Sequence, residues 1–152
     1  MATEKTARAV WEGTLAEGRG QFSLGSGAVT DQAVTWKDRA EGGEGTSPEE
    51  LIAAAHASCV LMALAGGLAR ASTPATRLES EAKTTFDQVG EGFAFTKIEL
   101  KITGDVEGID GVAFLEAAEA ARDNCPVSKA LEGNVEISVE ATLSSPTPSR
   151  SG

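Results

Sequence analysis

The sequence predicts an α+β fold with a mainly antiparallel sheet and one long, buried central helix. Segments with strand-like alternation occur in groups, and only two longer segments have the composition of helices, an order that is typical of this class. The chain has 152 residues, of which 41% are hydrophobic and 24% are charged. This length and composition suit a single globular domain with one sizeable core.

The first group of predicted strands precedes the long helix. Three short segments are separated by glycine-rich turns, and they read ARAVWEG at 7–13, GQFSLGSG at 20–27 and AVTWKD at 33–38. Turns of this kind on either side of a short segment are typical of strands. We therefore expect three strands between residues 7 and 38.

The predicted central helix contains Leu51–Ala69, 19 consecutive residues without Asp, Glu, Lys or Arg. This length approaches that of a transmembrane helix. Only seven of these residues are strongly apolar and seven are alanine, which suits a helix buried on all sides of a protein core better than a bilayer span. Ser47 is a suitable N-cap, Pro48 fits the first turn, and acidic residues at 49 and 50 complement the helix dipole.

One small domain can hardly cover this helix on every side. A chain of 152 residues has few other elements with which to surround it. A homodimer that packs two such helices together is the simplest solution, and we expect one.

A β-hairpin is predicted after the helix, over 78–102. Gly90-Glu91-Gly92 supplies the turn, and in the second strand Ile98, Leu100 and Ile102 alternate with charged residues. Phe93 and Phe95 fall on the charged phase of this alternation. Either a bulge resets the register, or a second subunit covers the two rings.

The last third of the chain predicts two helices and a strand. One helix covers Gly111–Asn124, with Val112, Leu115, Ala118 and Ala121 available for one face. Pro126 ends it and opens a short turn, PVSKAL. The segment 134–143 alternates cleanly as a final strand, and the tail 145–152 has the composition of disorder. We therefore place the domain at 1–144.

The net charge and the composition of the chain exclude several classes of binding partner. The net charge of −10 argues against nucleic acid, whose binding needs clustered Lys and Arg, and against an anionic membrane surface. The N-terminus lacks the apolar core of a secretory signal, so we expect the cytoplasm. Two cysteines and one histidine cannot supply four zinc ligands from Cys and His alone, and we expect no bound metal or cofactor.

Cys59 and Cys125 are the only cysteines, and three interpretations are open: inert core thiols, a structural disulfide or a working redox pair. Long-lived structural disulfides are rare in a reducing cytosol. Cys125 precedes Pro126, so backbone N–H groups of a short helix would favour its thiolate. Cys59 lies among apolar residues, where burial makes a thiol inert unless a cation reaches it.

Arg39 and His56 are the two residues that could activate Cys59. Arg39 precedes a glycine-rich loop that leads into the helix, with acidic residues close by, although it could equally be a solvated surface charge. His56 lies three residues before Cys59, which raises a Cys–His hydrolase as an alternative. A lone histidine in a helix is more often a structural residue.

The segments GTSPEELIAAAHASC, which ends at Cys59, and NCPVSKAL, around Cys125, resemble the OsmC/Ohr family of thiol-dependent organic hydroperoxide reductases. The resemblance extends over nearly the whole chain, through VWEGTLAEGRGQFSLGSG and GFAFTKIELKITGDVEGID. Two cysteines in these sequence contexts, in this order and on a chain of this length, make the resemblance to this family specific. The AAHASC form and the arginine at position 39 resemble the OsmC branch. The resemblance implies an intertwined homodimer with an antioxidant role in oxidative stress.

The resemblance also implies a mechanism. Cys59 would attack the peroxide and become a sulfenic acid, and Cys125 would condense with it to give a disulfide. An external dithiol, for which a lipoyl group is one candidate, would reduce the disulfide by exchange. Arg39 would hold Cys59 as thiolate and polarise the peroxide, and Glu49 would orient Arg39 through a charge-assisted hydrogen bond.

Helix geometry constrains this site. Glu49 and Cys59 are ten residues apart on one predicted helix, hence about 15 Å apart along its axis. Either the helix is broken, or Glu49 serves the Cys59 of a second subunit. We expect the second arrangement, which would make the dimer obligatory for activity.

The apolar surroundings of Cys59 suggest a pocket for the organic part of a peroxide. Its expected lining is Ala53, Ala55, Val60, Met62, Phe93 and Phe95, although core packing explains each of these residues equally well. Two alternatives remain at this stage: a non-catalytic ligand- or thiol-binding protein on the same scaffold, and a structural Cys59–Cys125 disulfide without a redox cycle.

Overall fold

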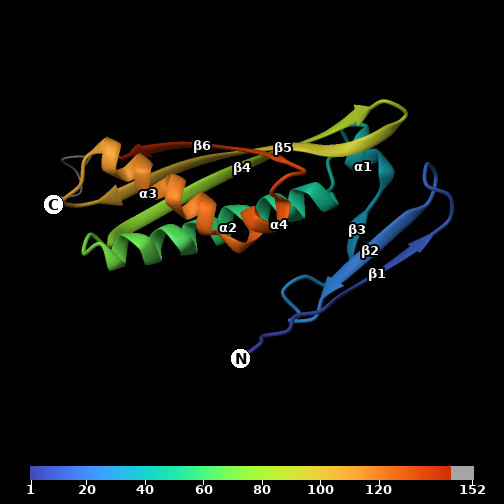
Figure 1. Cartoon of the computed structure of the whole chain (residues 1–152). Coiled ribbons are helices and arrows are strands. Elements are labelled where there is room, and N and C mark those ends of the chain that lie inside the picture. The colour runs from blue at the N-terminus through green and yellow to red at the C-terminus, as the bar shows by residue number, and fades with distance from the viewer. Residues whose placement is uncertain (145–152) are drawn as a thin grey trace. The chain divides into compact units, whose positions relative to one another are not determined.

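The computed structural model describes residues 1–144 in two compact units, Met1–Leu51 and the chain from Ile52 onward, and each is considered by itself (Figure 1). Helix α2, Pro48–Arg70, begins in the first unit and continues in the second. A single domain over 1–144 stays a prediction. The expected disordered tail, 145–152, lies outside the described residues.

The first unit contains a three-stranded antiparallel sheet. Its strands are β1 (Ala7–Glu12), β2 (Arg19–Leu24) and β3 (Gln32–Val34), in that order. The predicted third strand was too long at its C-terminal end, because the chain turns at Thr35 into helix α1, Trp36–Ala40. The Thr35 side chain accepts a hydrogen bond from the backbone N–H of Asp38 at 3.1 Å, which is the geometry of a helix N-cap.

The second unit contains the larger sheet, in the order β4–β5–β6. The long strands β4 (Ala75–Val89) and β5 (Gly92–Val106) form the predicted antiparallel hairpin. Strand β6 (Glu136–Leu143) pairs with β5 in parallel, and helices α3 (Gly111–Asn124) and α4 (Pro126–Leu131) provide the crossover that a parallel pair requires. The sheets are mainly antiparallel, as predicted.

A bulge in the hairpin resolves the question of the phenylalanines. Thr85 pairs with Lys97, but the next residue, Phe86, pairs with Phe95, so that Thr96 is an extra residue in β5. This shift moves Phe93 and Phe95 onto the same face as Ile98. The ring of Phe93 stacks on that of Phe86, with centroids 5.3 Å apart.

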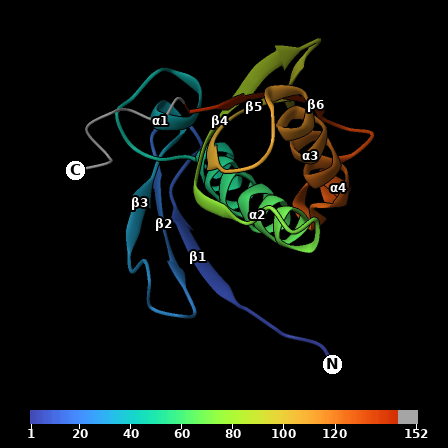
Figure 2. The same cartoon turned by 90° about the vertical axis from the view of Figure 1, so that its left-hand side faces the viewer.

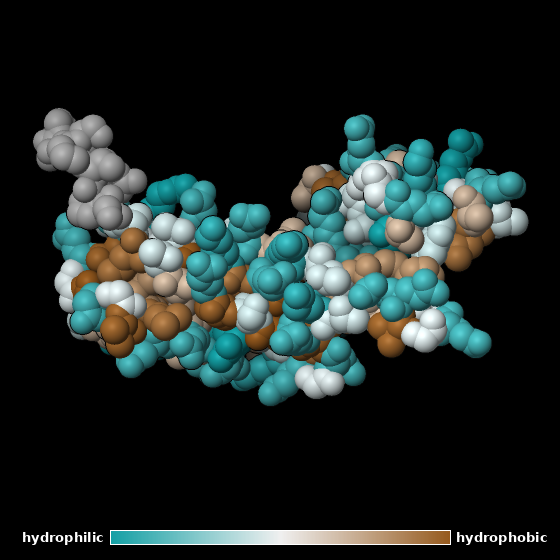
Figure 3. All heavy atoms as spheres, turned by 90° about the horizontal axis from the view of Figure 1, so that it is seen from above, coloured by the Kyte–Doolittle hydropathy of each residue, from teal (hydrophilic) through white to brown (hydrophobic). Residues whose placement is uncertain are grey.

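The core of the second unit lies on one face of the larger sheet, where both α2 and α3 pack (Figures 1 and 2). The buried members of this core are Val60, Leu64, Leu68, Leu100, Ile102, Val106, Phe114, Ala118, Ala121 and Cys125. The opposite face carries charged residues such as Lys83 and Glu99, as expected for an alternating strand that meets water on one side. Apolar residues also reach the surface between hydrophilic ones in the view from above (Figure 3).

One chain buries only one face of α2. The buried residues His56, Val60, Leu64 and Leu68 recur every fourth position, which places them on one side of the helix. On the other side Met62 is 76% exposed and Leu51 38% exposed. Among the described residues α2 alone has the length and composition of a membrane span, a property that core helices of soluble proteins share.

Helix α3 has its predicted bounds, and its inner face matches the prediction at Ala118 and Ala121 but not at Val112 and Leu115. The Asp110 side chain caps it by accepting from the N–H of Ala113 at 2.8 Å. Phe114 is fully buried together with Ala118 and Ala121, whereas Val112 is 68% exposed, contrary to the expected face. The reason is the absence of a side chain at Gly104, which leaves room in the sheet for the ring of Phe114.

We predict that Gly104→Ala destabilises the fold by about 1–3 kcal/mol, the usual cost of overpacking a core. A methyl group at this position would overlap the ring of Phe114 and come within 3.0 Å of Leu78 Cδ2. The measurement is the free energy of unfolding in denaturant. Gly92→Ala is the matched control, because it lies in the same strand and its methyl group would meet nothing within 4 Å. Equal stability of the two variants would contradict this account of the core.

Candidate functional site

The two cysteines meet in the core of the second unit. Cys59 lies in the middle of α2 and Cys125 lies between α3 and α4, yet their sulfur atoms are 3.0 Å apart. Both thiols are free in the described chain; Cys125 is fully buried and Cys59 is half-buried. A disulfide has an S–S length of about 2.05 Å, so a small movement would join them.

The junction of two helices positions Cys125. Its backbone N–H donates to the carbonyl of Ala121 at 2.8 Å and ends α3, and its carbonyl accepts from the N–H of Lys129 at 3.0 Å and begins α4. Pro126 follows as the first residue of α4, where its missing N–H is not needed. The Cys-Pro pair therefore sets the turn that carries this thiol to α2.

The two thiols have shifted pKa values in opposite directions. Burial raises the pKa of Cys59, and the hydrogen bond with Cys125 raises it further. Burial also raises the pKa of Cys125, but hydrogen bonds from Cys59, Ser128 and Val127 outweigh it, so that its pKa lies below the usual value. Of the two thiols, Cys125 therefore loses its proton more readily than Cys59.

The expected pocket around Cys59 is not assembled as a set. Val60 is fully buried in the core, whereas Met62, two positions on, is 76% exposed. Residues two apart on a helix point to nearly opposite sides, so these two cannot line one pocket in a single chain. Ala55 is exposed and Ala53 half-buried, so the helix face beside Cys59 is apolar and partly open.

Arg39 and Glu49 form an ion pair within the first unit. Arg39 Nε donates to Glu49 Oε1 at 3.0 Å and its Nη2 donates to Oε2 at 2.9 Å, a two-point contact that fixes the guanidinium plane. The carboxylate of Glu49 is buried, and its hydrogen bond raises the pKa of Arg39. The predicted hydrogen bond between these residues is present, while their catalytic roles stay predictions.

Local structure explains why this ion pair forms. Helix α1 carries Arg39, and the first turn of α2 carries Glu49. The loop between the helices is held by Asp38, whose Oδ1 accepts from the N–H of Gly45 at 3.0 Å. A side chain at Gly43 or Gly45 would overlap Asp38, which explains the glycines in this loop.

His56 and Ser128 form a second polar contact beside the cysteines. His56 Nε2 and Ser128 Oγ are 2.6 Å apart, and both residues are buried. His56 Nδ1 has no hydrogen-bond partner among residues 1–144. Burial lowers the pKa of His56, which keeps its ring neutral at neutral pH. Sequence reasoning missed Ser128; the available signal was its place three residues after Cys125, matching His56 three residues before Cys59.

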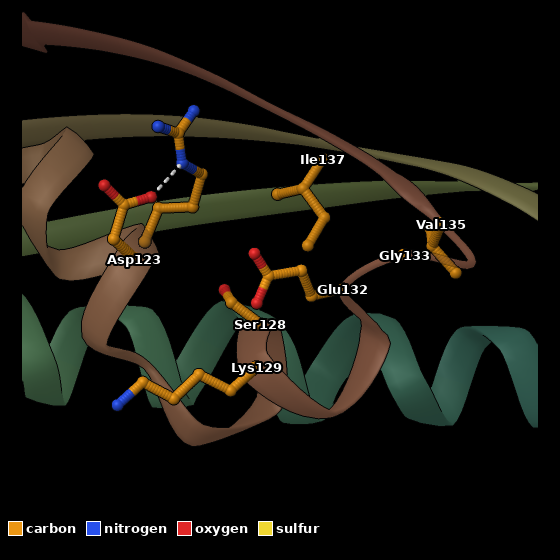
Figure 4. A pocket seen from close by; sticks show the side chains of 8 residues that line it. Asp123, Ser128, Lys129, Glu132, Gly133, Val135 and Ile137 are labelled. Atoms are coloured by element: carbon orange, nitrogen blue, oxygen red, sulfur yellow. Dashed lines mark hydrogen bonds and ion pairs between the residues drawn. The ribbon is translucent and has the colours of Figure 1, made fainter.

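Ser128 also lines a pocket of about 260 Å³ that lies beside α4 (Figure 4). Its other lining residues include Asp123, Lys129 and Glu132, together with Arg122, which pairs with Asp123 at 3.1 Å. The pocket is therefore polar and charged at its rim. It brings solvent close to Ser128.

These arrangements favour thiol redox chemistry. Two thiols in contact can pass between the dithiol and disulfide states with little movement of the backbone. In the part of the chain that the structure describes, no three His, Cys, Asp or Glu side chains are grouped as metal ligands.

Comparison with known proteins identifies the family of this chain. The family described as OsmC-like protein matches residues 41–140. The peroxiredoxin OsmC of Escherichia coli is 40% identical over 137 residues, which are 90% of this chain and 96% of that protein. The organic hydroperoxide resistance protein OhrB of Bacillus subtilis is 29% identical over 122 residues, 80% of this chain and 88% of that protein.

Solved structures share the fold. The crystal structure of the Bacillus subtilis OhrB has a TM-score of 0.62 at 28% identity and covers 90% of this chain and 98% of its own. An organic hydroperoxide resistance protein OsmC from Legionella pneumophila has a TM-score of 0.71 at 22% identity, with 90% and 96% covered. With a family match over most of its length and a relative of this identity, the chain belongs to the OsmC-like protein family.

Proposed function

We propose that this protein is a thiol-dependent peroxidase that reduces organic hydroperoxides to alcohols. The observation that carries the proposal is the 3.0 Å contact between the sulfur atoms of Cys59 and Cys125. Relatives named peroxiredoxin OsmC and organic hydroperoxide resistance protein support it. A contact between two free thiols is what a disulfide-forming cycle requires.

Exposure supports a division of roles between the cysteines. Cys59 is half-buried and lies on the helix with the open apolar face, so a peroxide can reach it. Its thiolate attacks one peroxide oxygen, the O–O bond breaks, the alcohol leaves with a proton, and Cys59 becomes a sulfenic acid. Cys125, which is fully buried beside it, then attacks the oxidised sulfur, the S–O bond breaks and water leaves. An external dithiol reduces the disulfide by exchange.

The first step needs a cation close to Cys59. Burial raises the pKa of that thiol, and the attacking species is the thiolate. We assign this role to Arg39, whose guanidinium is always charged and is oriented by Glu49 at 3.0 and 2.9 Å. The positive charge of the guanidinium is suited to polarising the peroxide oxygens.

We propose further that Arg39 and Glu49 act on the Cys59 of a second subunit. Helix α2 is continuous from Pro48 to Arg70, and ten residues of it separate Glu49 from Cys59 by about 15 Å along the axis. The face of α2 with Leu51 and Met62 exposed gives a homodimer a surface to bury. In such a dimer the site would be complete only at the interface.

The expected substrates are peroxides with an organic part. Alanines and the exposed Met62 surround the accessible side of Cys59, and an apolar surface favours an organic hydroperoxide over hydrogen peroxide. We place the reaction in the cytoplasm, with a dithiol such as a lipoyl group as electron donor and no bound metal or cofactor.

We predict that one equivalent of an organic hydroperoxide oxidises both thiols of the reduced protein within seconds. The measurement is intact mass and thiol count after rapid quenching, with peptide mapping of the Cys59–Cys125 link. In Cys125→Ser the reaction should stop at a sulfenic acid on Cys59, and in Cys59→Ser the peroxide should leave Cys125 as a thiol. If both thiols of the native protein survive, the protein binds ligands or thiols without turnover and the proposal is wrong.

The role of the second subunit has its own test. Glu49→Gln and Cys59→Ser homodimers should each be inactive. Mixing them under conditions that exchange subunits should restore about a quarter of native activity, because about half the dimers become mixed and each mixed dimer holds one complete site of two. No recovery after proven exchange would place Glu49 and Cys59 of one chain in the same site.

A further inference from the structure

To resolve the sulfenic acid, Cys125 must be deprotonated while it is fully buried, whereas Cys59 is partly exposed to solvent. Cys125 must lose its proton before it attacks, because the thiolate is the nucleophile. Its side chain is fully buried, so bulk water cannot take the proton directly. A group within the protein must therefore accept it.

The structure places two such groups in line with Cys125. Ser128 lies three residues after Cys125, in the first turn of α4, where both residues are buried, and hydrogen bonding by its hydroxyl lowers the pKa of Cys125. Ser128 Oγ is in turn 2.6 Å from His56 Nε2 on α2. The order of contacts is therefore thiol, hydroxyl, imidazole, and Cys59 lies on the other side of the thiol at 3.0 Å.

We infer that Ser128 and His56 form a proton relay that deprotonates Cys125 when it resolves the Cys59 sulfenic acid, an inference that rests on the proposed function. The proton of Cys125 passes to Ser128 Oγ as the Ser128 proton passes to His56 Nε2. The sulfur of Cys125 bonds to the sulfur of Cys59, and the S–O bond breaks. The departing hydroxide takes up a proton from water on the open side of Cys59 and leaves as water. His56 returns its proton through Ser128 to solvent in the pocket that Ser128 lines, so His56 ends neutral.

His56 has the properties that an acceptor needs. It is neutral at neutral pH, because burial disfavours its cation, and so Nε2 is available to receive a proton. Once protonated, Nε2 donates to Ser128, and the Ser128 hydroxyl donates to the Cys125 thiolate, so each hydrogen bond survives the transfer with its direction reversed. Ser128 touches a reacting atom and is a catalytic residue, whereas His56 acts through it and is a positioning residue.

His56 is also difficult to explain as a packing residue. It is fully buried in the row formed with Val60 and Leu64, where an apolar side chain would serve. Its Nδ1 is left without a partner among the described residues, and an unmet buried polar atom costs stability. The ring therefore carries a cost that its single hydrogen bond to Ser128 must offset.

The test separates attack by Cys125 from attack by Cys59, and it needs no peroxide. An aryl disulfide that releases a coloured nitrothiophenolate reacts first with the accessible thiol of Cys59. Cys125 then attacks the mixed disulfide and releases a second equivalent. The leaving group needs no proton, so the second rate at neutral pH reports deprotonation and attack by Cys125 alone. The same variants are then mixed with one equivalent of an organic hydroperoxide.

We expect His56→Gln and Ser128→Ala to leave the first release within about twofold of native and to slow the second by about tenfold or more, the lower range for general-base catalysis. Glutamine can hydrogen-bond Ser128 but cannot accept its proton. Ser128→Thr restores the hydroxyl and should recover most of the second rate. Ser80→Ala is the matched control, because it removes a half-buried hydroxyl that bonds α2 at the carbonyl of Ala57, 2.8 Å away.

Each outcome of this experiment supports or overturns the proton relay. An unchanged second release in folded His56→Gln or Ser128→Ala overturns the relay, as does equal slowing of both releases. If Ser128→Ala fails to fold, the comparison of Ser128→Thr with His56→Gln still decides, because only the histidine variant should be slow. If the native protein consumes no peroxide while the second release depends on His56 and Ser128, the proposed function is wrong and the relay stands.

Discussion

The packing of one face of α2 against the larger sheet determines where every reactive group of the second unit lies. His56, Val60, Leu64 and Leu68 are buried in one row because they recur every fourth residue. Cys59 precedes Val60 by one residue, so it lies about 100° around the helix from the middle of that row. This phase places the thiol at the edge of the core, half-buried, where it is in contact with Cys125 and still open on one side. A shift of one residue would bury the thiol or expose it completely.

Much of the fold follows from local patterns. The alternation in β5, the cap at Asp110 and the Cys125-Pro126 break are short-range signals, and the hairpin, α3 and α4 appear where they indicate. The parallel pairing of β6 could not be predicted, since it depends on how α3 and α4 return the chain to the sheet and not on the strand itself. The prediction that Val112 lies on the inner face of α3 was wrong for a similar reason, because the space at Gly104 decides which residues of α3 face the sheet.

The candidate site also has a part that the sequence predicts and a part that only the tertiary structure reveals. Cys59, Cys125, Arg39 and Glu49 were identified by resemblance, and the hydrogen bonds of the last two are present. Neither composition nor spacing indicates that two thiols 66 residues apart come within 3.0 Å, because that contact depends on the tertiary packing of α2 against the α3–α4 junction. Ser128 was missed for a physical reason: serine is common in the first turn of a helix, and only the approach of His56 from another element distinguishes it.

The opposite pKa shifts of the two thiols fit the proposed roles of Cys59 as the peroxide-attacking and Cys125 as the resolving cysteine. A resolving thiol must be a nucleophile only when its partner is oxidised, and must not itself meet the substrate. Full burial of Cys125 meets the second demand, while donors from α4 and Ser128 meet the first by lowering its pKa despite that burial. Cys59 has the opposite combination: it is partly accessible, and burial together with the hydrogen bond to Cys125 raises its pKa more than a backbone hydrogen bond from Val127 lowers it. In the proposed mechanism, the guanidinium of Arg39, which Glu49 holds in a fixed orientation, supplies the cation that Cys59 needs.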